Sequence, residues 1–229
     1  MTWICDRHAV VTGGGGGLGA ALCRRLLERG CRVSALDIDA DGLATLPADV
    51  ARAPCDLRDG DAVLRAVEAV RRVHGPVDVA VANAGVTHIQ AFRPGQSEAV
   101  RRVMAVNFFG AVHLLDAVVD DLKATRGQAT AISSVAGYAP LVGRTAYAAS
   151  KHAMHGFFDT LRLELRNDGV DVLVVCPSSI ATGIRQSYTG GGRGPDPTVG
   201  REDSPERAAA EIVRAIEGRR RFLAVGRVG

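Results

Sequence analysis

Short apolar segments rich in β-branched residues alternate along this chain with longer segments of helical periodicity. The apolar segments are nearly continuous, as in strands that are covered on both faces of a sheet. We expect strands at His8–Thr12, Cys31–Leu36, Ala51–Cys55, Val77–Asn83, Ala129–Ser133, Val170–Cys176 and Phe222–Val225. We expect helices at Leu18–Arg29, Asp39–Leu46, Asp59–His74, Ser97–Thr125, Thr145–Asn167 and Pro205–Glu217, with Asp59 and Ser204 placed as N-caps. The alternation predicts an α/β fold with a doubly wound parallel sheet.

One segment interrupts this rhythm. Residues 183–203 contain the run Gly190-Gly191-Gly192 together with Pro195 and Pro197, and they show no periodicity. A loop of this length inside a compact domain is typical either of a functional lid or of local disorder. It follows the sixth strand, at the edge of the sheet where ligands bind in open α/β folds. We therefore predict a single domain over residues 1–229 with a substrate lid around 183–203.

The composition argues against several other classes of protein. The net charge is only +3, and the densest basic cluster, Arg219–Arg221, is too short to indicate nucleic-acid binding. No secretory signal is visible at the N-terminus, and no apolar run approaches the roughly 20 residues of a membrane helix. The five cysteines have wide spacings without a C-x-x-C pair, which indicates neither a zinc site nor a disulfide framework. These observations favour a cytoplasmic protein without a metal and without membrane association.

A glycine-rich string joins the first expected strand to the first helix. It runs Thr12-Gly13-Gly14-Gly15-Gly16-Gly17-Leu18-Gly19. Glycines allow a tight turn and a close approach of the backbone to a pyrophosphate, which the N–H groups and dipole of the next helix attract. Such a string alone could be a flexible turn, but its place in a strand–helix–strand unit favours a dinucleotide site.

The acid that ends the second strand indicates which dinucleotide binds. Asp37 lies 18 residues after Gly19, close to the separation of about 20 at which a carboxylate binds the ribose hydroxyls of NAD. The same carboxylate repels a 2′-phosphate, and the next residue is Ile38 rather than an arginine. The alternative is that Asp37 and Asp39 only cap the following helix, although Asp39 is better placed for that role. We predict NAD as the cofactor.

Tyr147 and Lys151 are four residues apart in an expected helix and therefore share one face. A nearby ammonium favours a phenolate and lowers the pKa of a tyrosine from about 10 towards the working pH. The pair could thus supply a general acid/base, although exposed pairs at this spacing are also routine. Ser134 ends the preceding strand, and Asn107 lies within the long helix before it.

Taken in order, these motifs resemble those of the short-chain dehydrogenase/reductase family over nearly the whole chain. Ser134 precedes Tyr147 by 13 residues, as in the family pattern. A single motif is moderately specific, whereas the ordered set is highly specific. The set comprises Thr12-Gly13-x-x-x-Gly17-Leu18-Gly19, Asp56-Leu57, Asn83-Ala84-Gly85, Asn107, Ser134, Tyr147-Ala148-Ala149-Ser150-Lys151, Pro177, Ile180 and Thr182.

The resemblance implies a Rossmann-type sheet of about seven strands and assigns catalytic roles. Tyr147 would exchange a proton with the substrate oxygen, and Ser134 would hold that oxygen by a hydrogen bond. Lys151 would bind the nicotinamide ribose and lower the pKa of the tyrosine, while Asn107 would anchor a water of the proton relay. The implied reaction is reversible NAD(H)-dependent hydride transfer between a secondary alcohol and a ketone, in a homodimer or homotetramer.

The resemblance also assigns a set of cofactor contacts. Gly13, Gly17, Leu18 and Gly19 would surround the pyrophosphate, and Asp37 would bind the adenosine ribose. Asp56 and Leu57 would lie at the adenine, and Asn83, Ala84 and Gly85 would line the cleft. Pro177, Ile180 and Thr182 would lie at the nicotinamide, together with Tyr147 and Lys151. One departure concerns this last region, because Ser178 stands where the family often has glycine.

The substrate is predicted to be largely apolar, since the expected pocket wall contains Ala136, Ala139, Leu141, Val142 and Ile180. Tyr138 and Tyr188 flank the same region. The chain ends soon after its last expected strand, whereas many relatives carry a longer tail, so closure of the pocket and assembly are expected to differ from theirs.

Three alternatives use a related scaffold. A catalytically silent, dinucleotide-sensing regulator would not need Ser134, Tyr147 and Lys151 together. A halohydrin-type lyase resembles this family but replaces the lysine by arginine and loses the glycine loop. A sugar-nucleotide epimerase would have a longer C-terminal region. His152 and His155 are spaced for packing or an interface rather than for a metal site.

Overall fold

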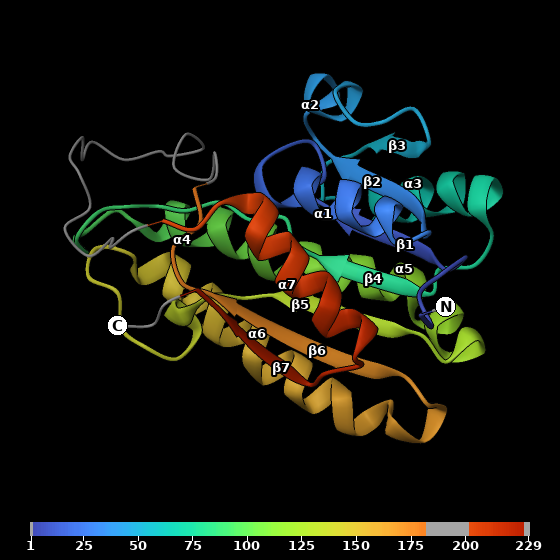
Figure 1. Ribbon diagram of the computed structural model, residues 1–229. Helices are drawn as coiled ribbons and strands as arrows, with labels where there is room; N and C mark the ends of the chain where they lie inside the picture. The colour runs from blue at the N-terminus through green and yellow to red at the C-terminus, as the bar shows by residue number, and fades with distance from the viewer. Residues whose placement is uncertain (1, 182–201, 227–229) are drawn as a thin grey trace.

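The structure is a computed structural model that describes residues 2–181 and 202–226, shown in Figure 1. Seven parallel strands form one sheet in the order β3-β2-β1-β4-β5-β6-β7. Strand β1 therefore lies inside the sheet, with β2 and β3 on one side of it and β4 to β7 on the other. The predicted doubly wound Rossmann-type sheet of about seven strands is confirmed. The strands are β1 (His8–Thr12), β2 (Arg32–Asp37), β3 (Val50–Pro54), β4 (Val79–Ala82), β5 (Gln128–Ile132), β6 (Asp171–Pro177) and β7 (Phe222–Val225).

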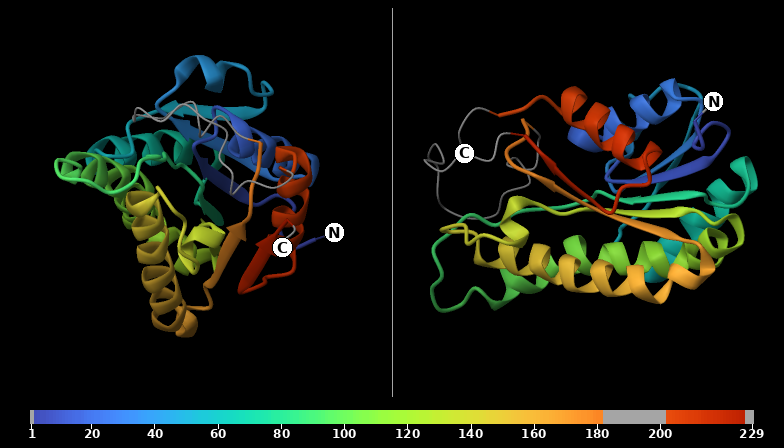
Figure 2. Two further views of the ribbon diagram at one scale, coloured as in Figure 1. Left: turned by 90° about the vertical axis from the view of Figure 1, so that its left-hand side faces the viewer. Right: turned by 60° about the horizontal axis from the view of Figure 1, so that its bottom comes forward.

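Helices cover both faces of the sheet, as the right-hand view of Figure 2 shows. Helices α1 and α7 pack on one face and share a core with the side chains that the strands point towards them. Helices α3, α5 and α6 enclose a second core on the other face. The helices are α1 (Gly17–Glu28), α2 (Ala40–Ala44), α3 (Gly60–His74), α4 (Ser97–Met104), α5 (Gly110–Thr125), α6 (Thr145–Glu164) and α7 (Pro205–Glu217), with short turns η1 (Ala105–Phe109), η2 (Val135–Gly137) and η3 (Arg166–Asp168).

Two differences from the expected elements have clear physical causes. Strand β4 is shorter than the expected Val77–Asn83, because the N–H of Val77 donates to the Asp121 carboxylate and Asp78 accepts from the backbone of His8. The expected helix Ser97–Thr125 is interrupted by a π-helical turn, η1, that is centred on Asn107. The expected N-caps are confirmed, since Asp59 accepts from Ala62 N–H and Ser204 from Arg207 N–H.

The segment Ser97–Thr125, which forms α4, η1 and α5, is long and apolar enough to cross a membrane by length and composition alone. This corrects the expectation that no segment approaches that length. About 44% of its most apolar window is buried inside the protein, and Leu114, Val118 and Leu122 belong to the core beneath α5. Packing in this core accounts for the apolar character of those side chains without a membrane.

The carboxyl ends of the strands lie on the left in Figure 1 and face the viewer in the left-hand view of Figure 2. The predicted lid over 183–203 lies almost entirely outside the described residues. Asp203, at its C-terminal end, is described and pairs with the residues that precede the predicted lid. Ala181 N–H donates to Asp203 O at 3.0 Å, and Asp203 N–H donates to Ser179 O at 2.9 Å. Ser179, Ala181 and Asp203 therefore lie side by side just beyond β6.

Candidate active site

The glycine loop joins β1 to α1 and leaves the N-terminus of α1 open. Gly13 and Gly17 have φ values of +67° and +52°, in the left-handed region that favours glycine. A Cβ on Gly19 would lie 1.9 Å from the carbonyl oxygen of Gly13, whereas a Cβ on Gly16 would meet nothing within 4 Å. Gly16 is the N-cap of α1 and provides no side-chain acceptor. The loop therefore forms a cradle of N–H groups that fits a dinucleotide pyrophosphate.

Asp37 lies at the end of β2 against this loop. Its Oδ2 accepts a hydrogen bond from Gly15 N–H at 2.9 Å, and its Oδ1 accepts one from Asp39 N–H at 3.0 Å. Asp39 caps α2 by accepting from Gly42 N–H, as expected. The Asp37 carboxylate therefore has two roles. It fixes the glycine loop through Gly15, and it places a negative charge beside that loop. The next side chain, Ile38, is 67% exposed.

The segment after β4 packs directly on the glycine loop. The amide of Asn83 donates to the carbonyl oxygens of Thr12 and Gly13, at 2.9 and 3.3 Å. The hydroxyl of Thr12 accepts from the N–H groups of Asn83 and Ala84. A Cβ on Gly13 would lie 2.8 Å from the Cα of Ala84. The motif Asn83-Ala84-Gly85 thus fixes the position of the glycine loop by hydrogen bonds and close packing, and it lies directly beside that loop.

Asn107 lies in the π-helical turn and is 1% exposed. Its Oδ1 accepts from Val86 N–H at 2.8 Å, and its Nδ2 donates to Val86 O and to Ser150 Oγ, each at 3.0 Å. Insertion of one residue into a helix is frequent at functional sites. Here the wider turn accompanies an inward-facing Asn107 that joins the segment after β4 to α6.

Tyr147 and Lys151 lie one helical turn apart in α6, and both are buried, with 9% and 3% exposure. The Lys151 ammonium lies 5.6 Å from the centre of the Tyr147 ring and donates to Ile132 O at 2.8 Å. The side chain of Ser134, which follows β5, lies near the Tyr147 hydroxyl and lowers its pKa. The structure thus brings Ser134, Tyr147 and Lys151 together at the carboxyl edge of the sheet.

Burial has opposite effects on the two titratable groups. It lowers the pKa of Lys151 from 10.5 to about 8, because the ammonium loses hydration. Burial also raises the pKa of Tyr147, and this is the largest influence on that group. The Ser134 hydrogen bond and the positive charge of Arg144 act in the opposite direction and lower the pKa of Tyr147. The effect of burial is larger than these two together, so the pKa of Tyr147 is raised above its ordinary value.

The remaining assigned residues surround this centre at greater distance. Asp56 forms an ion pair with Arg58, whose hydrogen bonds lower the pKa of the Asp56 carboxyl. Leu57 is buried, and its carbonyl oxygen accepts from His113. Pro177 ends β6, and Ile180 pairs with Asp203 beyond it. Thr182 and Tyr188 lie outside the described residues.

Three features of the site were missed in the sequence. Arg144 is 8% exposed and lies three residues before Tyr147, so helical spacing could have identified it. Ser150 connects Asn107 to the backbone of Tyr147, since its hydroxyl donates to Tyr147 O at 2.7 Å. His155 Nε2 lies 3.5 Å from Cys176 Sγ, and its ring centre lies 4.5 Å from that of Tyr138 with the two planes tilted by 51°. No local sequence pattern predicts that cluster.

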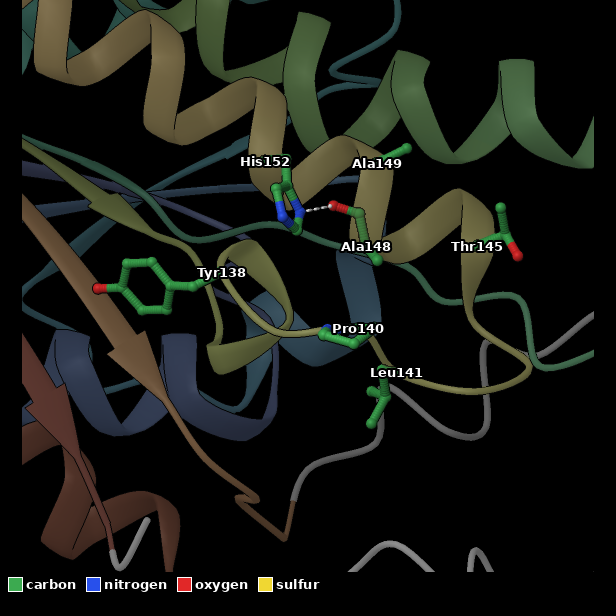
Figure 3. A pocket seen from close by; sticks show the side chains of 7 residues that line it. All are labelled: Tyr138, Pro140, Leu141, Thr145, Ala148, Ala149 and His152. Carbon is green, nitrogen blue, oxygen red and sulfur yellow. Dashed lines mark hydrogen bonds between the residues drawn. The ribbon is translucent and has the colours of Figure 1, made fainter.

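A shallow hollow of about 380 Å³ lies beside the site, between the loop after η2 and the first turns of α6 (Figure 3). Leu141, Thr145 and His152 are among its lining residues, and the ring of Tyr138 points away from the others. Tyr147 is not part of this lining, because it lies on the opposite, buried face of α6. Across the residues that the structure describes, no group of three or more histidines, cysteines or acids is placed to hold a metal ion.

Comparison with known proteins agrees with this geometry. The family model described as short chain dehydrogenase matches residues 7–191. Dehydrogenase/reductase SDR family member 7B of Xenopus tropicalis is 31% identical over 241 residues, covering 97% of this chain and 78% of that protein. The chain belongs to the short-chain dehydrogenase/reductase family.

Two solved structures show the same architecture. A short-chain dehydrogenase from Burkholderia cenocepacia in complex with NADP has a TM-score of 0.85 and 26% identity, covering 99% of this chain and 90% of its own. A family member from Burkholderia phymatum in complex with NAD has a TM-score of 0.88 at 23% identity, covering 98% and 90%. The family supports a dehydrogenase/reductase that uses a nicotinamide dinucleotide.

Proposed function

We propose that this short-chain dehydrogenase/reductase catalyses reversible hydride transfer between a secondary alcohol and a ketone, with NAD(H) as its cofactor. The observation that carries the proposal is the buried group of Ser134, Tyr147 and Lys151 at the same sheet edge as the open glycine cradle. When bound, the nicotinamide dinucleotide supplies or accepts the hydride. The protein supplies position, exclusion of water and a place for the proton.

Each side chain has a role in this mechanism. The Tyr147 phenol gives its proton to the carbonyl oxygen in reduction and takes it back in oxidation. The Ser134 side chain lies near the Tyr147 hydroxyl, so it would hold the same substrate oxygen. Lys151 is held by Ile132 O within reach of the ribose side of the cleft, and Asn107 fixes the adjoining backbone at Val86.

The preference for NAD is supported by Asp37. Its carboxylate faces the glycine loop at Gly15, where a 2′-phosphate would meet negative charge, and Ile38 offers no compensating cation. The test is a double substitution, Asp37→Ser with Ile38→Arg. We expect it to exchange the preference, lowering kcat/KM with NAD and raising it with NADP. A wild-type protein that already prefers NADP contradicts this assignment.

An apolar substrate is supported by the loop that follows η2. Tyr138 and Val142 are 52% and 87% exposed, and Leu141 is half-buried between them. Phe92, 69% exposed, lies near this loop, because Gln90 N–H donates to Gly143 O. Exposed apolar side chains that gather beside an active site are typical of a binding surface. Acceptance of only small charged substrates would contradict this part of the proposal.

The test of the reaction is a panel of secondary alcohols and ketones, assayed with both nucleotides by nicotinamide absorbance. Tyr147→Phe removes the proton-exchanging hydroxyl and is expected to lower turnover by about a hundredfold or more. Tyr138→Phe is the matched control, because it also removes a phenol hydroxyl but keeps the apolar ring that Tyr138 contributes to the proposed substrate surface. Undiminished activity in Tyr147→Phe would exclude Tyr147 as the acid/base. Binding of NADH without turnover of any compound would favour the sensing regulator instead.

We also propose a cytoplasmic homodimer or homotetramer, without nucleic acid or membrane as a partner. The support is the modest net charge of +3 together with two exposed apolar side chains, Phe109 of η1 and Leu163 of α6, which are 48% and 71% exposed. Light scattering of the purified protein tests the oligomeric state, and co-sedimentation with lipid vesicles tests membrane binding. A monomer, or a protein that sediments with the vesicles, would contradict this proposal.

A further inference from the structure

The segment between β4 and α4 crosses the beginning of α6, where Tyr147 lies. At one end, Val86 is fixed through both its backbone groups by the side-chain amide of Asn107. Four residues later, Gln90 N–H donates to Gly143 O at 2.7 Å. Because Asn107 also contacts Ser150, these two anchors lie on either side of the turn that carries Tyr147. His88 is midway between them.

His88 is buried without a hydrogen-bond partner. Its side chain is 7% exposed, and neither Nδ1 nor Nε2 contacts a partner in the described part of the chain. The neighbouring Thr87 is fully buried, and its Oγ1 is unpartnered in the same way. A neutral imidazole carries one donor and one acceptor, and burial without partners has a cost that native proteins rarely accept outside functional sites.

The position of His88 separates it from other buried polar groups that lack partners. Gln128 is also buried with both amide atoms unsatisfied, but it starts β5, at the amino edge of the sheet. Thr130 lies in the middle of the same strand. His88 and Thr87 instead lie at the carboxyl edge, between Gly85, whose Cβ position is 3.8 Å from Lys151 Nζ, and the start of α6. A substrate bound beside Lys151 and Tyr147 would supply the partners that these two side chains lack among the described residues.

We propose that His88 binds a second oxygen of the substrate, close to the reacting carbon. The inference rests on the proposed function and narrows its substrate class to ketones and alcohols that carry a neighbouring carbonyl or hydroxyl group. The imidazole N–H donates to a carbonyl oxygen, and its other nitrogen accepts from a hydroxyl. The apolar loop after η2 contacts the rest of the molecule.

Three aromatic ketones with the same diphenylethane skeleton test this assignment, because they differ only in the group next to the reacting carbonyl. Deoxybenzoin has a single oxygen, benzil has a second carbonyl, and benzoin has a neighbouring hydroxyl. His88→Phe keeps the ring volume and removes both nitrogens. We expect kcat/KM for benzil and benzoin to fall about tenfold or more, while the values for deoxybenzoin and the KM for NADH change less than about threefold. His74→Phe, at the C-terminal end of α3 and away from the carboxyl edge of the sheet, is expected to change none of them.

A measurement without substrate distinguishes a binding role from a structural one. Because the imidazole has no partner to lose, His88→Phe is expected to unfold at the same temperature as the wild type or higher. A clearly lower Tm, or an equal fall of kcat/KM for all three ketones, overturns the assignment of His88 while leaving the reaction in place. A wild type that is inert towards every ketone and alcohol of the panel overturns the proposed function itself.

Discussion

The ammonium of Lys151 donates a hydrogen bond to the carbonyl oxygen of Ile132, at 2.8 Å, at the end of the strand that leads to Ser134. A buried cation is thus held by a neutral oxygen rather than by a carboxylate. Its charge is only partly compensated, which is why burial lowers its pKa so far. Such a group is costly for folding, and its retention beside Tyr147 is best explained by catalysis.

Lys151→Met is therefore expected to stabilise the protein and inactivate it. The unfolded chain keeps the Lys151 proton up to pH 10.5, whereas the folded chain releases it above about 8. The difference destabilises the wild type by about 3 kcal/mol below pH 8, and this penalty disappears as the pH rises to 10.5. Urea denaturation at pH 7 and pH 10 measures it, with Lys123→Met on the surface of α5 as control. A Lys151→Met protein that is less stable than the wild type at pH 7 would contradict this prediction.

Gly16→Ala separates nucleotide binding from folding. Gly16 has an extended backbone, with φ −165°, and open space where a Cβ would lie. Alanine is therefore expected to leave the Tm unchanged but to occupy the cradle and weaken NADH binding about tenfold. NADH fluorescence titration measures the Kd. In Gly19→Ala, the Cβ would collide with Gly13 O, so that variant is expected to lose thermal stability as well. Unchanged NADH affinity in Gly16→Ala would show that the pyrophosphate lies elsewhere.

Most of the fold was predictable because its signals are local. Apolar runs mark buried strands, and N-caps such as Ser204 mark helix starts, so α7 was predicted with its observed bounds, Pro205–Glu217. The π-helical turn at Asn107 was not predictable, because it depends on hydrogen bonds between Asn107 and Val86, which are 21 residues apart. Helical periodicity continues across the insertion and hides it.

The candidate site was predictable in its members but not in its electrostatics. The spacing of Tyr147 and Lys151 predicts that they share a helix face, and they do. Spacing alone cannot show that the ammonium contacts Ile132, because that contact depends on how α6 packs against β5. The same limitation applies to Asp37. Its hydrogen bond with Gly15 forms because the end of β2 lies against the loop between β1 and α1.

A buried histidine on the amino side of the sheet controls stability in acid. His8 bonds through Nδ1 to Gly75 O at 2.9 Å and through Nε2 to Ser34 Oγ at 2.8 Å. Burial is the main cause that lowers its pKa from 6.5 to about 4. Between these pH values the unfolded chain binds a proton that the folded chain does not. Stability therefore falls by about 3 kcal/mol as the pH drops from 6.5 to 4.

His8→Gln removes this titration, since glutamine stays neutral and still donates to a carbonyl oxygen. The variant is expected to be less stable than the wild type at pH 7, with a difference that shrinks towards pH 4. Chemical denaturation across this range measures the free energy of unfolding. His152→Gln, at an exposed position on α6, controls for the loss of a histidine as such. A difference that stays constant with pH would mean that His8 has no such role.

Arg144 links the start of α6 to the acid/base chemistry. It is buried three residues before Tyr147, and its positive charge stabilises the phenolate and so lowers the pKa of Tyr147. Alcohol oxidation needs the phenolate as base, so its rate rises with pH through the pKa of Tyr147. Arg144→Gln is expected to move this rise to higher pH, whereas Arg144→Lys keeps the charge and is expected to shift it less.

The pH dependence of kcat/KM for alcohol oxidation distinguishes this effect from a loss of folding. A purely structural defect lowers the rate at every pH without moving the rise along the pH axis. Arg101→Gln is the control, because that arginine is exposed on α4. If the profile of Arg144→Gln has the same midpoint as the wild type, the charge of Arg144 does not reach Tyr147. The effect of burial on the pKa of Tyr147 would then be opposed by Ser134 alone.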